Sequence, residues 1–157
     1  MLAFRLPLPA ACLLLSLWRP AGAADYAVVV NAASPLTGLS ATDLTQILKA
    51  EKQTWDAGGK ILLVMPKEGT KEEALLLDKI YKTDGDGLKK FWTTQIYQNK
   101  VTAAPKTAIS KASLKLVELK VDAIAVVNVA EIPSGSPLKT LTIDGKKPGE
   151  NGYFLSN

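Results

Sequence analysis

The residues of this chain that are best placed to do chemistry lie between positions 61 and 81. An apolar run, Ile61 to Met65, leads to Gly69 and Thr70, and an amphipathic helix is expected from Thr70 to Lys82. The first amides of a helix lack intrahelical partners and lie at the positive end of its dipole, and a glycine lets a ligand approach the backbone closely. The pattern therefore predicts a binding site for a small anion at Gly69 and Thr70.

Thr70 and Glu73 have the spacing of a capping box. We expect the Thr70 hydroxyl to accept a hydrogen bond from the Glu73 amide, and the Glu73 carboxylate to accept one from the Thr70 amide. A strand, a turn and a capped helix also occur in α/β domains without any ligand. Glu68 favours this structural interpretation, because its carboxylate would repel an anion. Both interpretations stay open at this point.

The elements that must position these residues alternate along the chain. Strands are expected at residues 26–31, 61–65, 121–127 and 138–143, and helices at residues 40–50, 70–82, 88–96 and 110–119. The strand at 121–127 contains one charge, Asp122, which is typical of a strand buried on both faces. The order predicts an α/β fold with a mixed sheet and helices on both faces. No internal repeat or linker divides residues 24–157, so a single domain is expected.

Residues 1–23 have the pattern of a cleaved signal peptide. Arg5 gives a positive start, Leu6 to Leu17 form an apolar segment, and Ala21-Gly22-Ala23 resembles a cleavage site. The segment is too short to span the hydrocarbon core of a membrane. Cys12 lies too early in the apolar region for a lipoprotein anchor. We therefore expect a soluble protein in the periplasm.

Residues 24–157 contain no Cys, His or Arg, because Cys12 and both arginines, Arg5 and Arg19, belong to the leader. A thiol nucleophile, an imidazole base and a soft-metal site are thereby excluded. No enzyme activity, metal or cofactor is expected. The 19 basic residues of the chain include those two arginines, which leaves 17 lysines against 15 acidic residues. These charges are interspersed, so nucleic acid is not an expected partner.

Two further motifs do not predict ligands. The segment Asp84 to Gly87 begins like a calcium loop, but Leu88 and Gln95 stand where that loop needs ligands. Phe91 and Trp92 lie on the apolar face of their own helix, together with Leu88, and are expected in the core rather than on a stacking platform.

Ordered landmarks along the chain resemble one family, the phosphate-binding proteins of bacterial phosphate ABC importers, which are type II periplasmic binding proteins. The landmarks are Val28-Val29-Val30-Asn31, Leu39-Ser40 with Leu44 and Ile47, Trp55, Gly69-Thr70, Phe91-Trp92, Ala123-Ile124-Ala125-Val126 and Thr142-Ile143-Asp144-Gly145. The chain resembles a small, single-lobe member. Glu68-Gly69-Thr70 matches two positions of the family's Ser-Gly-Thr motif, and Lys67 is the cation nearest to a family arginine that has no counterpart here.

The resemblance implies a module that binds phosphate or another oxyanion and is associated with phosphate ABC transport. Candidate ligand residues are Lys67, Gly69 and Thr70, together with Ser34, which is expected on the same open surface. A micromolar site needs about 8 kcal/mol, whereas a helix N-terminus contributes up to about 2 kcal/mol and a charge-assisted hydrogen bond about 1.5–3 kcal/mol. The site is therefore expected to be weak or degenerate.

The alternative function is that of a non-transport periplasmic interaction domain, which kept the fold and lost the ligand. Under either function the open surface implies a partner. The partners considered are a membrane transporter, another exported protein and a second copy of the chain.

Overall fold

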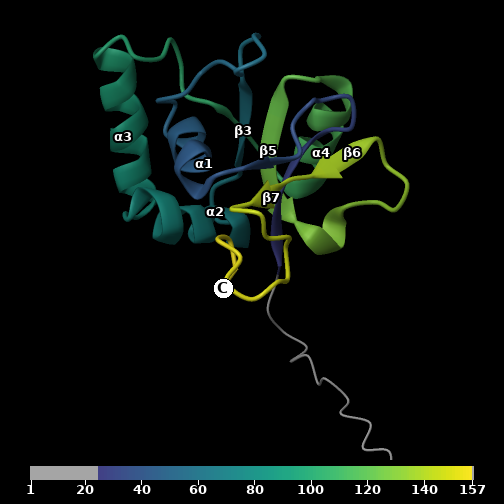
Figure 1. Ribbon diagram of the computed structural model, residues 1–157. Coiled ribbons are helices and arrows are strands. Elements are labelled where there is room, and N and C mark those ends of the chain that lie inside the picture. Colours follow the sequence, from purple (N-terminus) through teal and green to yellow (C-terminus); the bar gives the residue numbers. More distant parts are fainter. Residues whose placement is uncertain (1–24, 157) are drawn as a thin grey trace, which may run out of the picture.

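The computed structural model describes residues 25–156 of the chain (Figure 1). The signal peptide expected at residues 1–23, including Cys12, lies outside the described residues. Across residues 25–156, none of the helices is both long and apolar enough to cross a membrane.

A five-stranded mixed sheet forms the centre of the molecule, with the strand order β4-β3-β5-β1-β6. Its strands are β1 (Tyr26–Asn31), β3 (Leu62–Pro66), β4 (Lys106–Ala108), β5 (Ala123–Asn128) and β6 (Leu138–Thr140). Strand β3 runs parallel to both β4 and β5, whereas β1 is antiparallel to its neighbours β5 and β6. Two short parallel strands, β2 (Gly38–Leu39) and β7 (Thr142–Ile143), form a separate sheet.

Helices cover both faces of the main sheet, as the sequence predicts. They are α1 (Ala41–Leu48), α2 (Lys71–Leu76), which continues as a π-helix over Leu77–Tyr81, α3 (Gly85–Tyr97) and α4 (Ser110–Leu119). Figure 1 shows α1, α2 and α3 on one side of the sheet and α4 on the other. The Tyr81 hydroxyl donates a hydrogen bond to the Leu48 carbonyl, which joins the end of the π-helix to the end of α1.

The side chains of β1 alternate between two hydrophobic cores. Tyr26, Val28 and Val30 pack in the core that α1 and α2 cover, and Ala27 and Val29 pack in the core that α4 covers. Side chains of a strand point alternately to opposite faces, so a strand covered on both faces needs apolar residues at every position. This requirement explains the unbroken apolar run that predicts the strand.

Three differences from the sequence prediction are larger than a shift of one or two residues at the end of an element. The segment from Asp84 is the start of α3 rather than a break before it, because the Asp84 carboxylate accepts a hydrogen bond from the Gly87 amide and caps the helix. The strand expected at 138–143 is two strands in different sheets, divided at Leu141, which is fully buried and donates its amide to the Val28 carbonyl. The short strands β2 and β4 are not predicted.

Asn31 joins the end of β1 to the end of α4. Its side-chain amide donates to the Val117 carbonyl at 3.1 Å and to the Glu118 carbonyl at 2.9 Å, and its side-chain oxygen accepts from the Ala33 amide at 2.9 Å. The last carbonyls of a helix have no intrahelical partner. Asn31 therefore supplies the donors that the C-terminal turn of α4 lacks.

The C-terminal segment packs back onto the main core through Tyr153 and Leu155, which are both buried. Burial raises the pKa of Tyr153 to about 12, and burial also raises the pKa of Tyr81 above its ordinary value. A neutral phenol is therefore favoured in the folded state.

We expect the protein to keep its full stability below pH 10 and to lose stability as the pH rises from 10 toward 12. The unfolded chain releases the phenolic protons near pH 10, whereas the folded chain retains them to higher pH, so folding becomes less favourable across this interval. Melting temperatures at pH 8, 9, 10 and 11 would check this expectation. The substitution Tyr153→Phe should reduce the alkaline loss, and an unchanged pH dependence in this variant would contradict the assignment.

Candidate oxyanion site at the carboxyl edge of the sheet

The loop Lys67–Thr70 leaves β3 at the edge of the sheet where the parallel strands β4 and β5 also end. Helix α2 begins at this edge after β3, and α4 begins there after β4. The Ser110 hydroxyl at the start of α4 donates to the Glu72 carboxylate of α2 at 2.7 Å, so the two helix starts are in contact. In α/β sheets, ligands bind outside the carboxyl ends of the strands. The predicted anion site therefore lies at the edge where such sites are found.

Thr70 caps α2 as the sequence predicts. Its hydroxyl accepts a hydrogen bond from the Glu73 amide at 3.3 Å and donates one to the Lys67 carbonyl at 2.7 Å. The Thr70 amide donates to the same carbonyl at 3.2 Å. Gly69 has a φ of +82°, in the left-handed region that favours glycine. The loop is thus a tight turn closed on the Lys67 carbonyl.

The second half of the predicted capping box differs in its donor. The Glu73 carboxylate accepts a hydrogen bond from the Gly69 amide at 2.7 Å, not from the Thr70 amide. The physical reason is that the Thr70 amide already donates its hydrogen bond to the Lys67 carbonyl. Only 8% of Glu73 is exposed. An internal oxyanion therefore occupies the amide that was expected to bind an external one.

Of the two charged side chains in the loop, Glu68 forms an ion pair among the described residues and Lys67 does not. Glu68 forms an ion pair with Lys89 of α3 at 2.9 Å, and this hydrogen bond and the charge of Glu68 raise the pKa of Lys89. Both side chains are largely exposed, so the pair contributes little to stability. Lys67 is exposed, and its ammonium forms neither a hydrogen bond nor an ion pair with residues 25–156. Lys67 is thus a cation available to an anion bound at this loop.

Ser34 does not lie with the other three candidate residues. Strand β1 is antiparallel to β5, with Val30 opposite Ile124, and β3 is parallel to β5, with Leu62 opposite Ala123. The end of β1 is therefore level with the start of β3, and Ser34 lies at the opposite edge of the sheet from Thr70. The expectation of one shared surface is wrong for Ser34, because it depended on a strand direction that the local sequence does not encode.

A cavity of about 460 Å³, which the sequence did not predict, adjoins the loop. Its polar end contains Lys67, Glu68 and Glu73, and its apolar wall includes Leu88 and Trp92 of α3. Trp92 is buried, as predicted. Among residues 25–156, no group of three or more Asp, Glu, His or Cys side chains is arranged to hold a metal ion. Among the described residues at this edge, the groups that suit an anion are the Lys67 ammonium, which has no partner, and the Gly69 amide, which the Glu73 carboxylate occupies.

The fold is similar to that of solved substrate-binding proteins. A putative phosphate ABC transporter substrate-binding protein with bound phosphate from Clostridium perfringens superposes with a TM-score of 0.61 at 14% identity, covering 80% of this chain and 47% of that one. An ABC-type phosphate transport receptor from Vibrio cholerae gives a TM-score of 0.66 at 20% identity, with coverages of 85% and 54%. PstS from Borrelia burgdorferi gives 0.64 at 15% identity, with coverages of 86% and 56%.

These similarities confirm the predicted fold class, a mixed α/β sheet with helices on both faces that resembles one part of these substrate-binding proteins. The chain spans about half the length of the solved structures that it matches. No protein-family model and no curated protein sequence matches the chain.

Proposed function

We propose that this protein is a periplasmic-binding-protein-like module that binds phosphate or another small oxyanion weakly at the loop Lys67–Thr70. The observation that carries the proposal is the hydrogen bond of 2.7 Å between the Gly69 amide and the Glu73 carboxylate. The loop already holds one oxyanion, so its geometry suits the group. An external anion binds by taking the place of the Glu73 carboxylate, with Lys67 beside it as a counter-charge.

Exchange with Glu73 limits the affinity. A helix N-terminus contributes up to about 2 kcal/mol and a charge-assisted hydrogen bond about 1.5–3 kcal/mol, before the cost of immobilising the ligand. Displacing a carboxylate that is already hydrogen-bonded offsets part of this gain. A dissociation constant near 1 mM corresponds to about 4 kcal/mol, which these contributions can supply. Weak binding in the millimolar range is therefore the expected behaviour.

We further propose that the protein acts in the periplasm after removal of residues 1–23, in association with phosphate ABC transport. The fold neighbours, which are described as phosphate transport receptors and substrate-binding proteins, support this context. The carboxyl edge exposes Ile109 by 50% and Val129 by 36%, next to the starts of α4 and of the 3-10 helix Val129–Glu131. Apolar groups at an open edge suit a protein partner, either a membrane transporter, another exported protein or a second copy.

The substitution Glu73→Gln is expected to tighten phosphate binding about tenfold, because it removes the competing carboxylate and its negative charge. Glu68→Ser should act in the same direction. Thr70→Ala should weaken binding and lower the free energy of unfolding by about 1 kcal/mol, through loss of the cap. Titration of inorganic phosphate, followed by the amide shift of Gly69 in NMR spectra, measures all three.

Glu51→Gln is the matched control, since Glu51 is an exposed carboxylate that follows α1, away from the loop. It should leave phosphate binding unchanged. If the affinity moves equally in the Glu51 and Glu73 variants, net charge is responsible. If no variant changes the affinity, the loop is only structural.

The hydrogen bond that Glu73 already accepts within the loop supports the second function, an interaction domain without a small ligand. Because the buried carboxylate already pairs with the Gly69 amide, the loop is complete on its own. Under this function Glu73→Gln would lower stability, and phosphate would not shift the Gly69 amide in any variant. The same titration therefore separates the two functions.

A further inference from the structure

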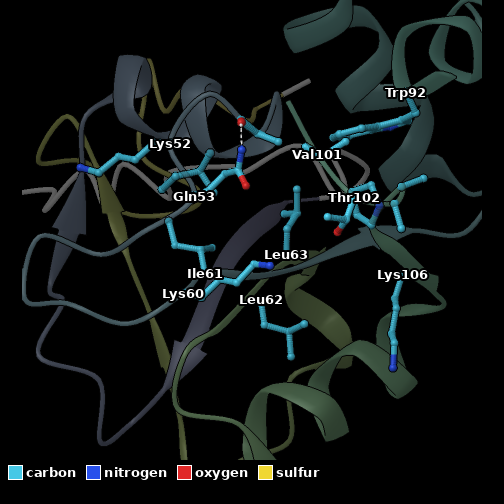
Figure 2. Close-up of a pocket in the computed structure, with 15 residues that line it drawn as sticks. Lys52, Gln53, Lys60, Ile61, Leu62, Leu63, Trp92, Val101, Thr102 and Lys106 are labelled. Atoms are coloured by element: carbon cyan, nitrogen blue, oxygen red, sulfur yellow. Dashed lines mark hydrogen bonds between the residues drawn. The ribbon is translucent and has the colours of Figure 1, made fainter. Parts of the chain in front are cut away.

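A second cavity, of about 220 Å³, lies at the edge of the sheet opposite the loop Lys67–Thr70 (Figure 2). It is formed where the chain leaves α1, where it enters β3, and by the segment 101–106 that leads into β4. Trp92 of α3 contributes to the wall. Trp92 also lines the cavity beside the loop Lys67–Thr70, but none of the loop residues lines this second cavity.

The charged side chains that line this cavity are all positive. It contains Lys52, Lys60 and Lys106 and no acidic residue, although the chain as a whole has nearly balanced charges. The Lys52 ammonium forms ion pairs with Asp43 at 3.4 Å and with Asp56 at 2.9 Å. Lys60 is exposed, and its ammonium has no hydrogen-bonding or ion-pair partner within residues 25–156.

The three lysines differ in direction. In the view of Figure 2 the Lys60 side chain points toward the middle of the drawn residues, whereas Lys52 and Lys106 point outward. Lys60 is therefore the cation that an occupant of the cavity would meet. An uncompensated ammonium beside apolar walls favours an anion whose remaining surface is apolar.

Hydrogen bonds join the segments that form the walls of this cavity. The Gln53 side-chain amide donates to the Ala50 carbonyl at 3.1 Å and to the Lys100 carbonyl at 2.8 Å, which ties the end of α1 to the chain after α3. The Gln53 carbonyl accepts from the Ile61 amide at 2.8 Å. Ile61 and Trp92 are themselves buried. A preformed apolar wall reduces the ordering cost of binding.

We propose that this cavity binds a small organic carboxylate with an apolar body. The carboxylate pairs with the Lys60 ammonium, and the apolar body packs against Ile61, Leu63 and Trp92. The volume is below the range of about 300–1,000 Å³ typical of sites for drug-sized ligands, so a molecule of the size of benzoate fits better than a larger one. Inorganic phosphate has no apolar part and gains nothing from these walls.

The test compares benzoate with the neutral amide benzamide, which has nearly the same shape. We expect benzoate to bind at least tenfold more tightly than benzamide, with shifts of the Val101 and Thr102 amides in NMR titrations of the purified protein. Lys60→Gln should remove the preference for benzoate and leave benzamide binding unchanged. Lys111→Gln is the matched control and should keep the preference, because this exposed lysine of α4 does not line the cavity.

Equal binding of benzoate and benzamide to the unchanged protein would overturn the proposal, as would a preference that survives Lys60→Gln. Absence of any shift at Thr102 in millimolar benzoate would also overturn it. Saturating phosphate should not compete with benzoate, since no residue of the loop Lys67–Thr70 lines this cavity. A negative result with benzoate does not change the expected phosphate titration of the Gly69 amide. The two proposals are therefore tested separately.

Discussion

Leu76→Ala is expected to lower the free energy of unfolding by about 2–5 kcal/mol, which is the usual cost of truncating a large side chain in a core. Leu76 of α2 is fully buried and belongs to the core that also holds Val28 and Val30 of β1. Removal of three carbon atoms leaves a cavity between helix and sheet that the close-packed surroundings fill only partly. Urea denaturation followed by circular dichroism measures the change.

Leu119→Ala is the matched control for this prediction. Leu119 ends α4 and is 67% exposed, so the same truncation should change the stability by less than about 0.5 kcal/mol. Similar losses in the two variants would show that α2 does not pack on the sheet as described.

Asn31→Leu is expected to cost about 3 kcal/mol of unfolding free energy. The substitution removes two donors to the Val117 and Glu118 carbonyls and one acceptor for the Ala33 amide, at a position that is buried. A buried polar group left without its partner costs about 1–3 kcal/mol, and here two carbonyls and one amide lose theirs. Water that reaches these groups as the loop relaxes reduces the total cost. The midpoint of urea unfolding reports the loss.

A second variant at this position separates hydrogen bonding from packing. Asn31→Asp keeps the size and the acceptor for Ala33, but it places a carboxylate against the negative end of the α4 dipole. It should be at least as destabilising as Asn31→Leu at neutral pH. Asn128→Ala, which removes only the cap of a 3-10 helix, should cost about 1 kcal/mol. An Asn31→Asp variant of normal stability would contradict the described contact.

Much of the secondary structure could be predicted because it is encoded locally. The apolar runs that form β1, β3 and β5 are each unbroken, since each strand is covered on both faces. Helix α4 occupies the predicted residues, and α1 differs by one or two residues at its ends. The strands β2 and β4 were missed because two or three residues carry no periodic signal.

The candidate site could be predicted only where it depends on neighbours in the sequence. The Thr70 cap follows from its spacing to Glu73 and is present. The position of Ser34 depends on the antiparallel direction of β1, which is set by pairing with β5 at the far end of the chain. The second cavity likewise needs Gln53 to meet Lys100, two segments that no local pattern connects.

The position of β1 in the sheet has a consequence for how the chain folds. This strand comes first among the described residues, yet it pairs only with β5 and β6, which come near the end. A chain that emerges from its N-terminus onward therefore carries Tyr26–Asn31 as an unpaired apolar strand until residues 123–140 have followed. Contacts between such distant residues slow folding, and an unpaired strand favours association with other chains. Completion of the sheet is thus a late event that requires nearly the whole chain. Truncations within β5 or β6 should therefore abolish folding of the whole domain rather than remove only the local strand.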